Sequence, residues 1–167
     1  MSIQINNQSD YALDKDLLAE YVQLCEYLLL QQSAPPGAEL SVTFVDETEM
    51  DALNKAYRGK QGATDVLAFP CDTAASDASD TDNKGDKLPT LLGDVVIAPQ
   101  VALQQNSDVA AEIRLLLVHG VLHLLGYTHD DDQAAACMEA REHELLSDWA
   151  QLWQGNPHTC PQGGCRD

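Results

Sequence analysis

Three histidines lie within eleven positions of one apolar stretch, HGVLHLLGYTHDDD, which begins at His119. On an α-helix, His119 and His123 would lie one turn apart on the same face, so both imidazoles could reach one ion. Gly126 can turn the chain after the helix and bring His129 to the same ion. Three neutral imidazoles and an open fourth position are typical of a catalytic zinc site. The spacing predicts a metal site, and the alternative is a set of hydrogen-bonded core histidines.

The residue after the first histidine restricts the chemistry of such a site. In zinc peptidases with the HExxH motif, this position holds the glutamate that acts as general base. Here it is Gly120, which has no side chain to move a proton. The motif therefore has a metal geometry like that of a peptidase without the peptidase's base, and another group must handle the proton.

Hydrophobic periodicity predicts the elements that position these histidines. A long helix capped by Ser107 or Asp108 reaches about Leu125, with Gly126 just beyond its end. Three further helices are expected, over about 15–32, from an N-cap at Thr48 to Gly59, and over 133–153. Four segments have the pattern of strands: SIQIN at an edge, ELSVTFV, TDVLAFP and LLGDVVIA. The predicted fold class is α+β, a small mixed four-stranded sheet packed with helices, with the His pair on a central helix.

Length and composition indicate one domain. With 167 residues the chain can bury a core, and we expect a single domain over 1–152. Residues 71–88 are rich in Ala, Ser, Asp and Thr, which predicts an acidic surface loop. Residues 153–167 are expected to form a disordered tail, although its His158, Cys160 and Cys165 have a spacing that could also bind a metal.

The net charge and the first residues of the chain restrict the functions that we expect. A net charge of −18 repels phosphate backbones and argues against tight binding of nucleic acid by a broad basic surface. The start MSIQINNQSD does not resemble a signal peptide, and no stretch is apolar enough to span a membrane. We therefore expect a cytoplasmic protein whose cysteines are reduced thiols.

Three segments, in order, resemble the YbeY family of bacterial endoribonucleases. VHGVLHLLGYTHDD is similar to the family's H-G-x-L-H-L-x-G-Y-D-H signature. LNKAYRGKQGATDVLAFP is similar to its LNxxYRxxxxxTDVLSFP block, and LLGDVVIAP to its GDIxIS strand. The resemblance extends from about Val42 to Leu146. Thr128 stands where the family usually has aspartate, and Ala68 where it has serine.

The resemblance implies a function and a set of site residues. It implies a zinc-dependent, single-strand-specific endoribonuclease, with one Zn²⁺, that acts in maturation of the 3′ end of small-subunit ribosomal RNA and in ribosome quality control. It further implies ribosomal RNA and the small subunit as partners, with a ribosomal protein or a GTPase as a possible partner, and neither DNA nor a membrane. His119, His123 and His129 align with the metal ligands, and Arg58 aligns with the family's functional arginine.

Hydrolysis of a phosphodiester needs a nucleophile and stabilisation of the charge that develops at phosphorus. A zinc-bound hydroxide is the expected nucleophile, and the planar fork of Arg58 suits phosphate oxygens, unless Arg58 forms a surface ion pair. Asp65 is a candidate to orient the water or to position Arg58, and its alternative role is to cap a turn. Asp94 and the acidic residues 130–132 could hydrogen-bond to the metal ligands and tune them. We expect instead that Asp94 is an exposed strand residue and that 130–132 interact with a helix dipole.

The acidity of the chain leaves two ways to hold RNA. Lys55, Arg58 and Lys60 could form a local basic strip beside the metal, and recruitment to the ribosome could deliver the substrate. His143 lies among charged residues, which predicts a solvated helix face. Two rival functions remain open: a zinc peptidase, which Gly120 disfavours, and a ribosome-assembly factor whose structural zinc would have a fourth protein ligand.

Overall fold

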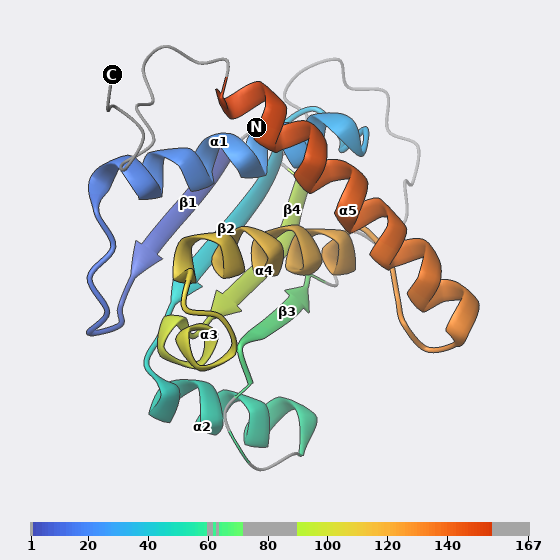
Figure 1. Cartoon of the computed structure of the whole chain (residues 1–167). Helices are drawn as coiled ribbons and strands as arrows, with labels where there is room; N and C mark the ends of the chain where they lie inside the picture. Colours follow the sequence, from blue (N-terminus) through green and yellow to red (C-terminus); the bar gives the residue numbers. More distant parts are fainter. Residues whose placement is uncertain (1, 60–61, 63, 72–89, 155–167) are drawn as a thin grey trace, which may run out of the picture.

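The computed structural model describes residues 2–59, 62, 64–71 and 90–154, and its centre is a mixed four-stranded sheet. In spatial order the strands are β1 (Ser2–Asn7), β2 (Ala38–Phe44), β4 (Thr90–Ile97) and β3 (Val66–Pro70). β1, β2 and β4 run parallel, whereas β3 pairs antiparallel with β4 at one edge. The α+β class, the mixed sheet and the edge position of β1 are confirmed (Figure 1).

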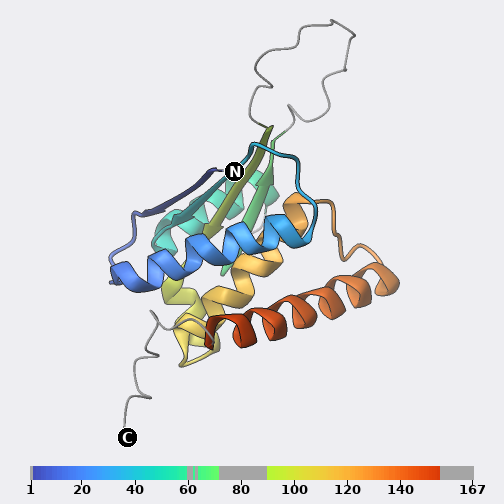
Figure 2. The ribbon, with the colours of Figure 1, turned by 90° about the horizontal axis from the view of Figure 1, so that it is seen from above.

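Five helices surround the sheet in the part of the chain that the structure describes. They are α1 (Lys15–Gln31), α2 (Glu47–Arg58), α3 (Pro99–Gln105), α4 (Val109–Leu124) and α5 (Asp132–Gln154). The sequence predicted four helices. The difference is the short α3, which the prediction did not separate from the long helix that follows it. α1, α4 and α5 lie on one face of the sheet and α2 lies on the other (Figure 2). The histidine-bearing α4 is therefore enclosed between the sheet and its neighbouring helices.

The sheet separates two cores of unequal size. Leu40, Val42 and Phe44 of β2 alternate toward the larger core, which they share with side chains of α1, α4 and α5. On the opposite face, Val96 of β4 packs with Met50 of α2 in the smaller core. Because β4 is buried on both faces near its end, it forms a fixed platform beneath α4.

Two predicted helices differ from the structure in their boundaries. α2 begins at Glu47 with Asp46 as its N-cap, so Thr48 lies inside the first turn and the predicted cap was wrong. The Asp46 side chain instead accepts a hydrogen bond from the backbone N–H of Asp10 at 2.9 Å. Gly59 does end this helix, with φ +66°. α5 spans Asp132–Gln154, one residue longer at each end than the helix predicted over 133–153.

Some predictions fall on parts of the chain that the structure does not describe. Of the acidic segment 71–88 only Cys71 is described, and the tail residues His158, Cys160 and Cys165 lie outside the described ranges. Within those ranges, none of the helices has the length and apolarity that crossing a membrane requires.

Candidate metal centre

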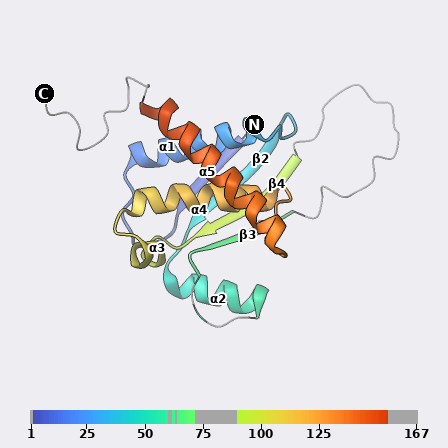
Figure 3. The ribbon, with the colours of Figure 1, turned by 45° about the vertical axis from the view of Figure 1, so that its right-hand side comes forward.

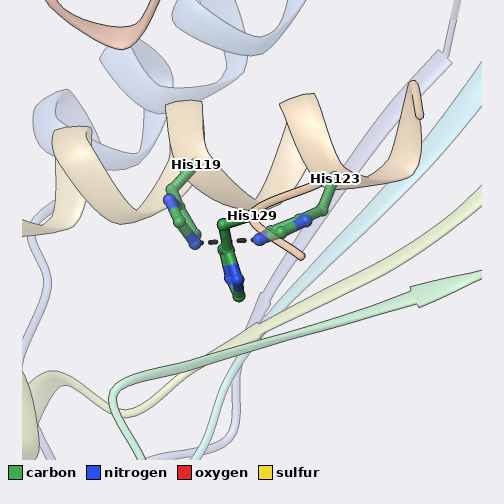
Figure 4. Close-up of side chains that lie close together, drawn as sticks. All are labelled: His119, His123 and His129. Atoms are coloured by element: carbon green, nitrogen blue, oxygen red, sulfur yellow. Dashed lines mark hydrogen bonds between the residues drawn. The ribbon is translucent and has the colours of Figure 1, made fainter. Parts of the chain in front are cut away.

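His119, His123 and His129 converge at the C-terminal end of α4 (Figure 4). The Nε2 atoms of His119 and His123 are 3.0 Å apart, and one ring nitrogen of each of the three residues lies within 4.8 Å of the others. The two helical histidines are half-buried and His129 is exposed. The predicted convergence is confirmed, and the three residues together could hold a metal ion.

The outer ring nitrogens of both helical histidines face acceptors. His123 Nδ1 lies 2.9 Å from the backbone carbonyl oxygen of Tyr127, and His119 Nδ1 contacts the Glu142 carboxylate of α5. A carbonyl or carboxylate oxygen accepts a hydrogen bond, so each Nδ1 carries the proton and each Nε2 presents a lone pair. This is how metal-binding histidines are usually oriented in proteins.

The two facing lone pairs fit a cation. At 3.0 Å, two unprotonated nitrogens repel each other unless a proton or a metal ion lies between them. A tetrahedral ion with metal–nitrogen distances of about 2.0–2.1 Å places neighbouring ligand nitrogens about 3.3 Å apart. The spacing and the donor set therefore suit zinc.

The turn at the end of α4 explains how His129 comes to lie beside His119 and His123. Gly126 has φ +103°, a left-handed conformation that an L side chain rarely adopts. Its N–H donates to the carbonyl oxygen of His123 at 3.1 Å, and the N–H of Tyr127 donates to that of Leu122 at 3.0 Å, which together form a Schellman motif. The turn directs the Tyr127 carbonyl toward His123 and the chain toward His129, as the position of Gly126 predicted.

Gly120 faces the sheet rather than the histidines. A Cβ at this position would lie 2.7 Å from Cγ1 of Val95 on β4, closer than real Cβ atoms approach a neighbour. The glycine therefore lets α4 pack tightly on the sheet. A glutamate here would have no room, so this site cannot have the general base of HExxH peptidases at its usual position.

Glu142 is the residue that sequence reasoning missed. Its neighbourhood on α5 was predicted to be a solvated face, yet its side chain is only 13% exposed and contacts His119. The signal was its place between Met138 and Leu145, at spacings of four and three that put it on the inward face of the helix. His143, by contrast, is exposed as predicted.

The other acidic candidates have structural roles. Asp131 Oδ1 accepts a hydrogen bond from the N–H of Ala134 at 2.7 Å, so it caps the start of α5. Its two neighbours, Asp130 and Asp132, are exposed, as is Asp94 on β4. The helix-start interpretation is confirmed for Asp131, and the exposed-strand interpretation for Asp94.

Arg58 and Asp65 differ in their relation to the histidines. Burial lowers the pKa of His123, and the neighbouring His119, His129 and, least of these, Arg58 lower it further, whereas the hydrogen bond to the Tyr127 carbonyl opposes the shift. Arg58 is exposed, and no carboxylate of the described residues forms an ion pair with it. Asp65 is half-buried before β3, its Oδ1 lies 3.5 Å from the hydroxyl of its neighbour Thr64, and no hydrogen bond joins it to the described histidines. Both catalytic roles stay predictions.

Comparison with known proteins identifies the family. The family model described as Endoribonuclease YbeY matches residues 4–150. The Endoribonuclease YbeY of Acidothermus cellulolyticus is 40% identical over 153 residues, covering 89% of this chain and 92% of that protein. That of Moorella thermoacetica is 38% identical over 153 residues, covering 88% and 96%. The solution structure of TM1509 from Thermotoga maritima shares the fold, with a TM-score of 0.57, 24% identity and coverage of 98% of this chain and 99% of that one. The chain belongs to the endoribonuclease YbeY family.

Proposed function

We propose that this protein is a zinc-dependent endoribonuclease that cleaves unpaired RNA, and that its substrate is the 3′ end of small-subunit ribosomal RNA. The observation that supports this most directly is the convergence of His119, His123 and His129 in a chain whose relatives are named endoribonucleases. These three residues are the proposed ligands of one Zn²⁺. Ribosome quality control, a cytoplasmic location and a ribosomal protein or GTPase partner belong to the same proposal.

The donor set favours a catalytic role for the ion over a structural one. Structural zinc sites are closed by four protein ligands, whereas catalytic sites keep a position open. Among the described residues, no cysteine, carboxylate or further histidine joins the three imidazoles as a ligand. When bound, zinc supplies Lewis acidity toward a phosphoryl oxygen and lowers the pKa of a water molecule.

Residues of the chain would orient the metal-binding imidazoles and bind the RNA phosphate. The Tyr127 carbonyl and the Glu142 carboxylate hold the imidazoles of His123 and His119 with Nε2 free. The Arg58 guanidinium is suited to bind a phosphate oxygen next to the histidines, because its donor fork matches phosphate geometry and no described carboxylate competes for it. Asp65 remains a candidate to position Arg58 from the start of β3.

The basic side chains that the structure describes support attraction of RNA at one place on the surface rather than over the whole surface. Arg114 and Arg141 are paired with Glu20 and Glu144, at 2.6 and 2.7 Å. Of the three residues predicted to form a basic strip, Lys60 lies outside the described ranges. The other two, Lys55 and Arg58, which we call the α2 strip, are exposed in the last turn of α2 without a carboxylate partner among the described residues. In a chain of net charge −18 such a strip holds RNA weakly, so we propose that the assembling small subunit delivers the substrate.

The test compares three proteins on one ribosomal RNA fragment that has an unpaired 3′ end, with metal content measured for each. We expect the parent to bind zinc and cleave, His123→Ala to lose both, and Arg58→Ala to keep zinc but cleave more slowly. Equal cleavage by all three would refute the proposed site. Casein serves as the second substrate, and cleavage of casein without cleavage of RNA would favour a peptidase.

A further inference from the structure

Tyr57 is an unusual surface residue in this protein. Of the nine aromatic side chains, all within the described ranges, Tyr57 alone is exposed, with 69% of its surface open to solvent. Its ring lies against that of Phe69 on β3, with centroids 4.9 Å apart and an interplanar angle of 62°. Phe69 therefore holds the Tyr57 ring in place while most of the ring stays uncovered.

The position of Tyr57 connects it to the candidate metal centre. It lies between the two residues of the α2 strip, next to Arg58, and its ring packs on Phe69 of β3, a strand that contacts the histidine-bearing α4. Figures 1 and 3 show β3 between α4 and the end of α2, and β3 is an edge strand of the sheet formed by the described residues. A strand of nucleic acid that binds Arg58 would therefore pass Tyr57 within about one nucleotide of chain length.

We propose that Tyr57, supported by Phe69, stacks on an unpaired base of the RNA strand that the histidine site cleaves. This inference rests on the proposed function and adds a subsite to it. Stacking of bases on aromatic side chains tolerates any base sequence but requires that the base be free of a duplex. The contact would therefore favour single-stranded substrate.

Charge identifies nucleic acid as the occupant. The exposed ring is flanked by Lys55 and Arg58, both exposed and without a carboxylate partner among the described residues. A cationic groove with an aromatic platform is how proteins bind single strands without sequence preference. Stacking also adds affinity that does not depend on attraction of phosphates, which a chain with 27 acidic and nine basic residues provides poorly.

The experiment measures cleavage of one fluorescent RNA, unpaired or annealed to its complement, by the parent, Tyr57→Ala and Tyr57→Phe. Leu152→Ala is the control, because Leu152 is an exposed apolar side chain, 57% open, on α5. We expect Tyr57→Ala to raise KM for the unpaired RNA about 5- to 150-fold with kcat little changed, and Tyr57→Phe and Leu152→Ala to resemble the parent. The dependence of KM on salt should be the same in Tyr57→Ala and the parent, and shallower in Arg58→Ala.

A direct readout separates this inference from the proposed function. In Tyr57→Trp, the new indole should lose fluorescence when unpaired RNA is added in the presence of a chelator, while the parent's two tryptophans change little. If Tyr57→Ala has a KM within twofold of the parent's and Tyr57→Trp shows no quenching, the stacking site is wrong even though the parent cleaves RNA. If the parent cleaves no RNA, the proposed function fails, and the quenching still decides whether Tyr57 binds bases.

Discussion

The contact between Glu142 and His119 predicts a specific loss of zinc affinity. Glu142 supplies the one acceptor described for His119 Nδ1, and the two side chains are 13% and 29% exposed. Glu142→Ala removes this acceptor, so the imidazole can rotate or take the wrong tautomer before it binds an ion. Glu142→Gln keeps an oxygen that accepts the same hydrogen bond but removes the charge.

The expected loss of zinc affinity follows from the position of the Glu142–His119 pair, which is partly shielded from water. Loss of the group that orients a metal-binding histidine typically weakens metal affinity 10- to 100-fold, which is about 1.4 to 2.7 kcal/mol. We expect Glu142→Ala to fall in this range and Glu142→Gln to lose less. Glu139→Ala removes an exposed carboxylate on the same helix and should bind zinc like the parent.

Competition with a fluorescent zinc chelator measures the dissociation constant of each variant, and circular dichroism confirms that each is folded. If Glu142→Ala binds zinc within twofold of the parent, the carboxylate does not orient His119. If instead the variant lowers the melting temperature of the zinc-free protein and leaves zinc affinity unchanged, Glu142 has only a packing role. Either result would refute the reasoning from the tautomer of His119.

Three further outcomes are expected. Gly120→Ala should lower the free energy of unfolding by about 1–3 kcal/mol because of its contact with Val95, and urea titrations should show a smaller loss from the same change in a Val95→Ala background. Gly126→Ala forces a left-handed conformation on a residue with a side chain, so chelator competition should show weaker zinc binding. Because burial lowers the pKa of His123 in the folded protein, the unfolded chain binds more protons below pH 6.5. Zinc-free protein should therefore lose stability as pH falls from 6.5, and His123→Gln should flatten that dependence in urea titrations at pH 7 and 5.

The sequence alone determined the features that depend on local backbone geometry. His119 and His123 lie on one face because a helix places residues four apart one above the other. Gly126 ends that helix because only glycine readily adopts its positive φ. The edge strand, the alternating β2 and the end of α2 at Gly59 follow from equally local patterns.

The tertiary structure alone decided which distant groups meet at the site. Glu142 reaches His119 from 23 positions away, because α5 packs against α4 at a place that no local pattern specifies. Val95 explains Gly120 because β4 passes beneath that turn of α4. Tyr57 of α2 meets Phe69 because β3 is the edge strand next to α2. Periodicity tells which face of an element is buried, but the partner on that face depends on how whole elements pack together.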